Sequence, residues 1–573
     1  MIVEPAPLTE EQRAIVDLDV DARAIVVAGP GTGKTHTLIH RAAALAARGV
    51  APSEILVLSF TNAVVGELRR RLAQVADSDA GFVRPTTLDS HAARIVARDE
   101  LDPVVLGFDK TVLRATVATE SNPDHAGATR YRHVIVDEAQ DLVGVRLAFI
   151  ETLLGATDAG FTVLGDPAQG IYGFSERSTG TPSTGIDILG DDFPDVQRFH
   201  LTQDHRSLRP GASPGHGLRP LVLGGTDPDV AHHAVLGRLR DSERLTLSQL
   251  ATALKRADDA TGILCRNNGE VLYLSGLLAD AGIAHKVRRA AIDRPTPSWI
   301  ARLLGDVGSA EISRRQFHRI TASASDEWRA DSWKALRRLA GNRSGALDMQ
   351  RLRENLHRIN PEETPDAADR VPVISTVHRS KGLEYETTIV LEPHVLDAGQ
   401  ATDEEIRVLY VALTRARVRT LRLKRPEMPG RLVRPAGRWL MVPWRGRGTL
   451  RVELCIGDVE PGLDECEPDS ARARQDYLRD QVKPGDAVEL CLLDDEHVYA
   501  IEHRRNRIGV TAAEFRPLAS DRPHRITGAR VDCLRSAAGD PGRTQNLAIG
   551  AGGLWLVPEI VGLGDLQWQE CTR

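Results

Sequence analysis

Short apolar runs rich in β-branched residues alternate with helical stretches along the first 208 residues. The runs are AIVVAG (24–29), ILVLSF (55–60), HVIVDE (133–138) and FTVLGD (161–166). Buried strands that alternate with helices are typical of an α/β domain with a parallel sheet. The ligands of such a domain are expected beyond the carboxyl ends of its strands.

A second α/β rhythm follows a stretch rich in Gly, Pro and Ser, RPGASPGHGLRP (209–220), which is typical of a linker. Its expected strands lie near 262–265, 371–376 and 387–392. The residues at about 290–365 between them are polar, helical in pattern and rich in arginine. The pattern therefore predicts a second parallel-sheet domain that carries a small helical insert.

The last part of the chain has a third pattern, in which short runs alternate between apolar and polar residues and end in turn-like breaks. Such alternation predicts a β-rich domain, either a small barrel or a sandwich. A chain of 573 residues is also too long for one core. We expect an α/β domain at 1–208 with a small insert at about 90–130, an α/β domain at 209–445 with the insert at about 290–365, and a β-rich barrel-like domain at 446–573.

The composition leaves the partner open, because a net charge of -6 does not exclude a basic groove on one face. The N-terminus has acidic residues and prolines where a signal peptide needs a basic end and an apolar run, and no apolar stretch approaches ~20 residues. The six cysteines are scattered without a C-x-x-C pair. These features predict a cytoplasmic protein with reduced thiols, no membrane partner and neither a zinc ribbon nor an iron–sulfur cluster.

One segment is basic against this background. Residues 313–358 hold eleven Lys and Arg against five acidic residues, with Trp328 and Trp333 among them. Two interpretations stay open: a patch that faces DNA, and a solvated amphipathic helix. No site is assigned to the segment.

The loop after the first strand has the pattern of a phosphate-binding loop, AGPGTGKT, with alanine in the place of the first glycine. Glycines allow backbone N–H groups to turn toward phosphate, Lys34 would reach the β- and γ-phosphates, and Thr35 would bind magnesium. The predicted ATP-binding residues of this loop are Ala28, Gly29, Pro30, Gly31, Thr32, Gly33, Lys34 and Thr35.

The strand at 133–138 ends in VDEAQD, which supplies the partner motif. Asp137 would complete the magnesium shell, while Glu138 would orient or deprotonate the attacking water. A phosphate loop and an acidic strand end in one α/β unit together predict hydrolysis of a nucleoside triphosphate.

Five ordered motifs carry a resemblance to a known family. They are AGPGTGKT, VDEAQD, GDPAQGIYGF (165–174), STVHRSKGLEYE (375–386) and RVLYVALTRAR (407–417). In this order they resemble the UvrD/Rep group of superfamily 1 DNA helicases. The resemblance implies two RecA-like P-loop domains, ATP and Mg²⁺ as cofactors, and a DNA substrate.

The resemblance also implies roles on the nucleotide side. Gln12 would read the adenine edge, Gln169 would sense the γ-phosphate, and Arg206 and Arg415 would be arginine fingers. Gly382 and Glu384 match further nucleotide-side positions. The family tyrosine that stacks on adenine is His205 here.

On the DNA side, the resemblance implies that seven residues contact a single strand, and the aromatic ones could stack on bases. These residues are Phe60, Thr61, Asn62, Tyr172, Phe174, Thr376 and His378. Gln140 would couple hydrolysis to motion, and Asp141 would brace its loop, with an arginine as the expected partner.

Both inserts are smaller than in large members of the family, so duplex unwinding is less certain than translocation. We predict an ATP-dependent translocase or helicase on single-stranded or tailed duplex DNA, moving 3′ to 5′, in repair, recombination or defence. Two alternatives are a DNA-stimulated ATPase subunit that needs a partner to unwind, and a DNA-binding adaptor with a vestigial ATPase. Residues 446–573 could bind a protein partner; they hold one lysine and no nuclease motif.

Overall fold

The computed structural model describes residues 7–75, 79–99, 107–171, 175–176, 182–205, 215, 217–224, 227–255, 259–288, 295–342, 344–359, 371–393, 402–444, 448–455, 457–462, 468–493, 498–518, 523–539 and 550–568. By its contacts the chain divides into two compact units. The first comprises Met1–Arg244 and Ser380–Leu423, and the second comprises Leu245–Arg379 and Lys424–Arg573. The three-domain boundaries expected from the sequence stay a prediction.

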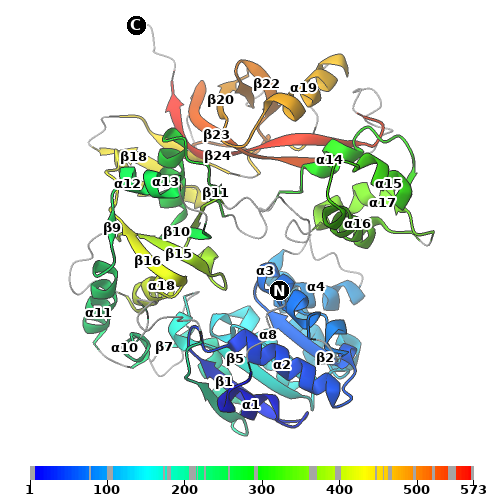
Figure 1. The fold of residues 1–573 in the computed structure, drawn as a ribbon, viewed down its shortest axis with the longest axis vertical. Helices are drawn as coiled ribbons and strands as arrows, with labels where there is room; N and C mark the ends of the chain where they lie inside the picture. The colour runs from blue at the N-terminus through cyan, green and yellow to red at the C-terminus, as the bar shows by residue number, and fades with distance from the viewer. Residues whose placement is uncertain are drawn as a thin grey trace. The chain divides into compact units, whose positions relative to one another are not determined.

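A six-stranded sheet organises the first unit, in the order β3-β2-β4-β5-β1-β8 (Figure 1). Each neighbouring pair is parallel. The predicted α/β fold class is therefore confirmed. The strands are β1 (Arg23–Ala28), β2 (Ile55–Ser59), β3 (Thr86–Thr87), β4 (His133–Val136), β5 (Gly160–Gly165) and β8 (Gln197–Leu201).

Helices cover both faces of this sheet, which explains why β1, β2, β4 and β5 are apolar at nearly every position. Ile25 faces a core shared with one group of helices, and the next residue, Val26, faces the core of the other group. The first group is α4 (Leu88–Val96), α6 (Phe108–Ser121), α8 (Val145–Gly155) and α9 (Gly185–Asp192); the second is α1 (Glu10–Val16), α2 (Lys34–Ala47) and α3 (Asn62–Leu72).

Residues 380–423 add a further α/β piece to the first unit. β15 (Tyr385–Leu391) and β16 (Ala416–Leu423) pair in parallel, and α18 (Asp403–Leu413) connects them. The shorter elements of this unit are α7 (Pro123–Ala126), β6 (Ser175–Glu176), β7 (Pro182–Ser183), α10 (Arg219–Leu223) and α11 (Pro228–Arg240).

The second unit also contains parallel strands, as the second α/β rhythm predicts. β14 (Val373–Thr376) pairs in parallel with β10 (Thr261–Cys265) and with β11 (Lys286–Val287). The helices α12 (Leu247–Leu254) and α13 (Asn268–Asp280) accompany them.

An eight-stranded antiparallel sheet completes the second unit, in the order β17-β18-β19-β24-β23-β20-β21-β22. The β-rich character of the C-terminal region is thus confirmed, although the sheet starts at Gly430, before the predicted boundary. Its strands are β17 (Gly430–Val433), β18 (Leu440–Pro443), β19 (Arg451–Leu454), β20 (Ala487–Leu492), β21 (Tyr499–His503), β22 (Asn506–Val510), β23 (Arg525–Ala538) and β24 (Leu554–Gln567).

The arginine-rich segment shares one hydrophobic core with this sheet. Ile300, Phe317 and Leu336 belong to the same buried cluster as Ile526 and Ile560. Of the two tryptophans, Trp333 is 8% exposed, and Trp328 packs against Trp299 with ring centroids 5.0 Å apart. The elements are α14 (Trp299–Leu304), β12 (Glu311–Ile312), α15 (Arg314–Ile320), α16 (Asp326–Ala340), β13 (Leu347–Asp348) and α17 (Met349–Asn355).

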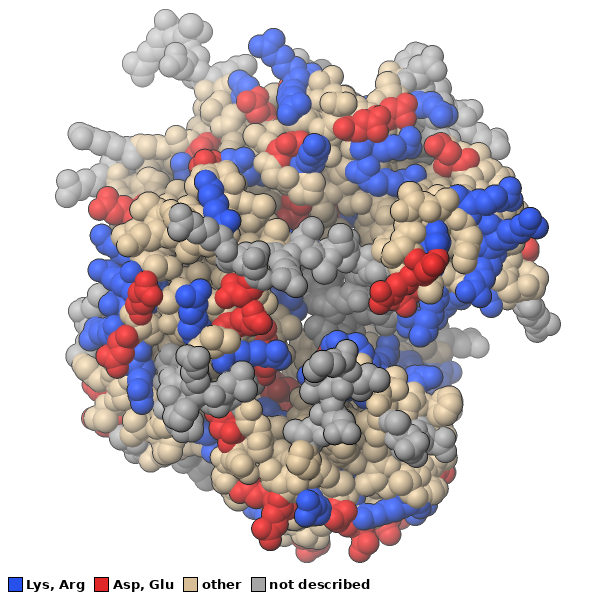
Figure 2. Space-filling view, viewed as in Figure 1, with Lys and Arg blue, Asp and Glu red and all other residues tan. Residues whose placement is uncertain are grey.

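The tryptophans of the segment are therefore packing residues, and its charge lies on the outer surface. Arg314, Arg315, Arg319, Lys334 and Arg338 are exposed. Figure 2 shows Lys and Arg side chains gathered over these helices.

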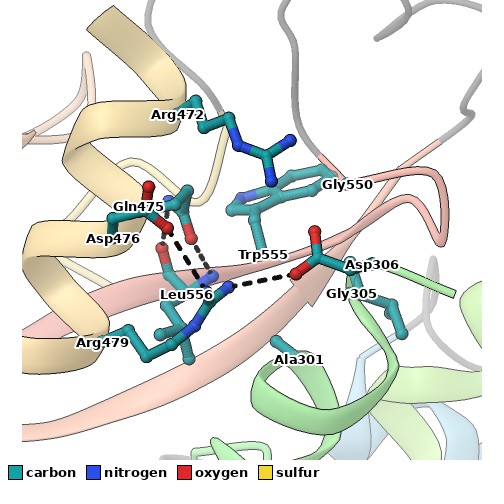
Figure 3. Close-up of a pocket in the computed structure, with 11 residues that line it drawn as sticks. Ala301, Gly305, Asp306, Arg472, Gln475, Asp476, Arg479, Gly550, Trp555 and Leu556 are labelled. Atoms are coloured by element: carbon teal, nitrogen blue, oxygen red, sulfur yellow. Dashed lines mark hydrogen bonds and ion pairs between the residues drawn. The ribbon is translucent and has the colours of Figure 1, made fainter.

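Between α14, α19 (Pro468–Gln481) and β24 the packing leaves a pocket of about 20 Å³ (Figure 3). Arg479 forms ion pairs with Asp306 at 3.7 Å and with Asp476 at 3.3 Å, and Gln475 binds the backbone of Leu556. This space holds about one water molecule. The pocket is thus a small gap in the packing of α14 and α19 against the sheet. No helix among the described residues is long and apolar enough to cross a membrane.

Candidate nucleotide-binding site

The predicted phosphate loop connects β1 to α2 with the backbone geometry that such a loop needs. Gly31 has φ 79° and Gly33 has φ 83°, in the left-handed region that favours glycine. A Cβ at Gly33 would lie 2.5 Å from Nε2 of Gln12, so any other residue would displace the Gln12 amide and would also adopt a strained backbone. The N-terminus of α2 has no side-chain cap, which leaves its first N–H groups and dipole available to an anion.

Gln12 lies directly against this loop. Its Nε2 donates a hydrogen bond of 3.1 Å to the carbonyl of Thr32, and its Oε1 accepts one of 3.1 Å from the backbone of Thr9. The second bond is half of a capping box that starts α1. The helix cap therefore fixes the position of Gln12 beside the loop.

Lys34 and Glu138 face each other across the site. The Lys34 ammonium lies 3.4 Å from Oε1 of Glu138. Burial acts to lower the pKa of Lys34, but the carboxylates of Glu138, Asp166 and Asp137 outweigh it, and the net shift is upward. Lys34 is therefore held as a cation, as a phosphate-binding lysine requires.

The two carboxyl groups at the end of β4 differ in their electrostatics. Burial and then the charge of Glu138 raise the pKa of Asp137 to about 7. Burial also acts to raise the pKa of Glu138, but Lys34, Lys381 and the Gln140 amide lower it to about 2. The opposite shifts of the two adjacent groups place the negative charge of the pair preferentially on Glu138.

Glu138 also has a strained backbone. It sits at φ 56° and ψ 39°, which is left-handed helical. A non-glycine residue there costs on the order of 1–3 kcal/mol and is found where the surrounding structure imposes it. The left-handed residue reverses the chain direction after β4 and leads into a short 3₁₀ helix, Ala139–Asp141, which places Gln140 and Asp141 directly after the two acidic residues.

A chain of hydrogen bonds connects Glu138 to residues much further along the sequence. Nε2 of Gln140 donates to the Glu138 carboxylate, and Oε1 of Gln140 accepts a bond of 2.9 Å from the backbone N–H of Asp166. The Asp166 carboxylate accepts a bond of 2.9 Å from Nε2 of Gln169, whose Oε1 accepts one of 2.8 Å from Nη2 of Arg415. We call this set, Glu138–Gln140–Asp166–Gln169–Arg415, the relay.

Lys381 also links two loops of this region, the one that follows β4 and the one that follows β5. Its ammonium forms an ion pair with Asp141 and donates to the backbone carbonyl of Gln169. Both side chains of the pair are nearly inaccessible, at 6% and 2% exposed. The prediction that Asp141 braces its loop agrees with this contact, but the expectation of an arginine partner was wrong.

Three basic residues near the site were missed from the sequence. Besides Lys381, Arg407 donates to the carbonyl of Pro167, and Nε of Arg219 forms an ion pair of 3.0 Å with Asp166. The Arg219 side chain also lies over the phosphate loop, with its Cδ 3.2 Å from the Cβ position of Gly29. A signal existed for Lys381, because only eight of the 73 Lys and Arg residues are lysine. Arg219 and Arg407 had no such signal among 65 arginines.

Several predicted residues have structural contacts of their own. Thr61 caps α3 by accepting from the N–H of Val64, and Phe60 packs against one sheet core. Glu384 forms an ion pair of 2.7 Å with Arg417, and Gly382, at φ 74°, lies beside Val64.

No described contact connects the remaining predicted residues to the relay. In the second unit, Thr376 ends β14 and its hydroxyl accepts from the N–H of Arg379, while His378 starts the turn that follows. Asn62 opens α3, but the described part of the chain does not include its side chain. Tyr172, Phe174 and Arg206 lie outside the described residues.

The residues present fit a magnesium–triphosphate complex. No group of three or more His, Cys, Asp or Glu side chains in the described part of the chain is arranged to hold a metal ion alone. Magnesium is usually held by one or two carboxylates together with phosphate oxygens and water. One buried carboxyl at Asp137, the Thr35 hydroxyl and a glycine loop at a helix N-terminus are such an incomplete shell, which the phosphates would complete.

Two family models match parts of the chain. The profile of the UvrD/REP helicase N-terminal domain matches residues 8–102 and 100–180, and that of the UvrD-like helicase C-terminal domain matches 373–420. The fold and site define a P-loop nucleotide-binding protein built on parallel sheets. Residues 8–180 and 373–420 thus match the N-terminal and C-terminal domains of UvrD/Rep-type helicases.

Individual relatives are similar at modest identity. The ATP-dependent DNA helicase UvrD2 of Mycobacterium tuberculosis is 25% identical, over 72% of this chain and 78% of its own length. DNA helicase II of Escherichia coli is 23% identical, over 46% of this chain and 49% of its own. The solved structure of Pif1 helicase from Candida albicans covers 74% of this chain and 95% of its own at 14% identity, with a TM-score of 0.38, too low to carry a structural conclusion.

Proposed function

We propose that the protein is a magnesium-dependent ATPase motor that moves 3′ to 5′ along single-stranded DNA and acts as a helicase in repair, recombination or defence. The relay carries this proposal. It links the carboxylate that would activate water to an arginine on the segment 380–423, through two glutamines whose amides can both donate and accept. A simple hydrolase has no need for such a connection, whereas a motor must report hydrolysis elsewhere.

The chain's own groups supply the chemistry of the hydrolytic step. Bound magnesium would neutralise phosphate charge and orient the triphosphate. Lys34 and the N-terminus of α2 would bind the phosphates, and Thr35 and Asp137 would hold the cation. Glu138, kept ionised by Lys34 and Lys381, accepts the proton of the attacking water. Arg415, with Arg206, stabilises the charge that develops on the transferred phosphoryl group.

The relay also supplies a route for coupling. An anion at the loop that competes for Arg415 would break the hydrogen bond between Arg415 and Gln169, because the guanidinium group has a fixed number of donors. Loss of the γ-phosphate would return Arg415 to Gln169. Residues 380–423 would then move relative to β4 and β5, which is the step that a translocase repeats.

A specific observation favours the alternative of an ATPase that unwinds only with a partner. The described helices between β3 and β4, namely α4, α6 and α7, contribute Ala92, Val112 and Ala126 to the core beside the sheet. They therefore serve as packing for the sheet. The described residues of this insert form no separate accessory domain. In this alternative, strand separation is therefore carried out by another element of the chain or by another protein.

The test is the ATPase rate of the full chain with single-stranded DNA, duplex DNA and RNA in parallel, at stated salt because backbone binding is salt-dependent. We expect stimulation by single-stranded DNA, and loss of turnover in Glu138→Gln. An unchanged rate with DNA, or an active Glu138→Gln variant, would refute the motor.

The helicase step needs a second measurement. Unwinding of a 3′-tailed but not a 5′-tailed duplex by the purified chain would establish both activity and polarity. Stimulated ATPase without unwinding would support the partner-dependent alternative. The alternative of a DNA-binding adaptor with a vestigial ATPase is not tested by deleting residues 446–573. That deletion would expose the hydrophobic core that the insert helices share with the C-terminal sheet.

A further inference from the structure

A pocket of about 590 Å³ opens on the first unit, away from the phosphate loop. Its lining includes Ile55, the first residue of β2, and Tyr131, two residues before β4 begins. β1, β2 and β4 belong to one sheet of parallel pairs, and the phosphate loop follows the carboxyl end of β1. The pocket therefore lies at the opposite, amino-terminal edge of the sheet.

Three arginines reach the pocket from separate segments: Arg84 precedes β3, Arg94 lies near the end of α4, and Arg130 precedes β4. Local folding explains the convergence. Thr87 caps α4 beside the carboxyl end of β2, and α4 then runs back over the sheet toward its amino-terminal edge. Three guanidinium groups are thus assembled by one strand–helix–strand connection.

These arginines have no carboxylate partner among the side chains that the structure describes. Arg84 donates 2.9 Å to the carbonyl of Gly81, and Arg94 donates 3.4 Å to the carbonyl of Ser90. Arg130 donates a hydrogen bond to the hydroxyl of Tyr131, and its carbon Cζ lies 4.6 Å from the centroid of the Tyr131 ring. Burial lowers the pKa of Arg94. Tyr131 acts to raise it, but the neighbouring arginines lower it further, so the net shift is downward. Uncompensated positive charge of this kind favours an anion.

The rest of the lining is apolar and aromatic. Phe82 is 64% exposed at the rim, although phenylalanine is normally buried. Ile55 and Tyr131 are buried on the lining below it. Planar guanidinium groups match the oxygens of a phosphate, and an exposed aromatic ring can stack on a base. The volume also lies within the range of pockets that hold small organic ligands.

We propose that this pocket binds a nucleoside phosphate, with phosphate at Arg84, Arg94 and Arg130 and the base at Phe82, and that its source is a DNA strand. The phosphate chemistry stands on the pocket alone, whereas the DNA source rests on the proposed function. A strand held here would contact the edge of the sheet opposite the ATP site. The first unit would thereby hold two nucleotide units at once, one hydrolysed and one only bound.

The experiment measures binding of a fluorescein-labelled oligo-dT to the full chain by anisotropy over a series of salt concentrations. In Arg84→Gln/Arg94→Gln/Arg130→Gln we expect the affinity to fall about tenfold, as loss of hydrogen bonds to a charged group implies. The slope of log affinity against log salt should fall in magnitude by about 0.7, the value for one phosphate contact on a single strand. The ATPase rate without DNA should stay unchanged.

Two further variants make the result decisive. Arg114→Gln, at an exposed position of α6, should bind DNA like the wild type. Phe82→Ala should weaken binding about fivefold or more, because a stacked base contributes ~1–3 kcal/mol. Since Phe82 is exposed, this variant reports on the pocket even if the triple variant is unstable. Wild-type affinity and slope in Phe82→Ala and in a folded triple variant would overturn the proposal.

The source of the phosphate is tested separately with a fluorescent ADP analogue in the Lys34→Ala background, where the phosphate loop is disabled. Absence of analogue binding, together with weaker oligo-dT binding in the pocket variants, supports a strand. Analogue binding that the three arginine substitutions abolish would instead assign a free nucleotide and overturn the DNA source. If the wild type binds no DNA at all, the proposed function fails. Binding of the ADP analogue alone then tests whether the pocket binds a phosphate group.

Discussion

Arg415 donates a hydrogen bond of 2.8 Å from Nη2 to Oε1 of Gln169, although 246 positions separate the two residues in the chain. Gln169 is itself fixed by its bond to Asp166, and Arg415 is 3% exposed. On this side, the buried guanidinium is held by a neutral amide. The arrangement suits an arginine that exchanges its amide for a phosphate oxygen.

The first prediction concerns the geometry of that arginine. Arg415→Lys keeps the charge but cannot form the planar fork, so we expect turnover to fall by roughly 10³-fold, within the range of arginine-finger losses. Binding of ATP should change little, because the loss falls on the transition state. Steady-state ATPase and nucleotide binding measure the two effects. Arg114→Lys is the control, and equal losses in both variants would contradict the role.

The buried pair of Lys381 and Asp141 predicts a non-additive effect on stability. Lys381→Met alone should lower the free energy of unfolding by about 3–5 kcal/mol, because it leaves the Asp141 carboxyl buried without its partner. Adding Asp141→Leu should recover most of that loss. Urea denaturation measures the cycle. Arg198→Ala, which removes an exposed pair with Asp191, should cost less than about 1 kcal/mol; additive losses at 381 and 141 would contradict a buried pair.

The left-handed backbone of Glu138 predicts an inverted order of two substitutions. Both Glu138→Ala and Glu138→Gly remove the side chain, but only alanine keeps a Cβ at φ 56°. We expect the glycine variant to be more stable by about 1 kcal/mol, the typical penalty for an L-residue in this region. Thermal unfolding of both variants measures the difference. In α6, where the backbone is helical, Ala118→Gly should destabilise by a similar amount; an alanine variant at 138 that is the more stable would refute the strain.

Two buried histidines predict a loss of stability in mild acid. Burial lowers the pKa of His91 to about 3, helped by Arg94, Arg130 and Arg98, and burial likewise lowers that of His133 to about 3. Below the unfolded value near 6.5, the unfolded chain binds more protons than the folded one. Stability therefore falls as pH decreases from 6.5 toward 3, by about 2 kcal/mol per histidine at pH 5.

His91→Leu tests this assignment. Neither ring nitrogen of His91 has a hydrogen-bond partner among the described residues, so an apolar replacement removes an unsatisfied group. We expect equal or higher stability at pH 7.5 and a shallower decline toward pH 5, measured by thermal melts at both values. His125→Leu, at an exposed position of α7, should keep the wild-type slope. An unchanged slope in His91→Leu would show that another group controls the acid response.

The sequence by itself determined the features that depend on short-range geometry. The glycines at 31 and 33, the lysine after them and the acids at 137 and 138 specify local backbone conformation and chemistry, so the loop, the strand ends and the α/β rhythm could be predicted. The resemblance of five ordered motifs pointed to the family. The confirmed parallel sheets follow from apolar runs that need burial on both faces.

Only the tertiary structure decided which distant groups meet. It paired Asp141 with a lysine, brought Arg219 and Arg407 to the loops after β1 and β5, and joined the arginine-rich insert to the C-terminal sheet in one core. It also gathered three arginines at the far edge of the first sheet. In a chain with 65 arginines, sequence cannot show which of them face a site, because side-chain partners depend on packing between elements. The local motifs fixed the chemistry of the site, and long-range packing fixed its connections.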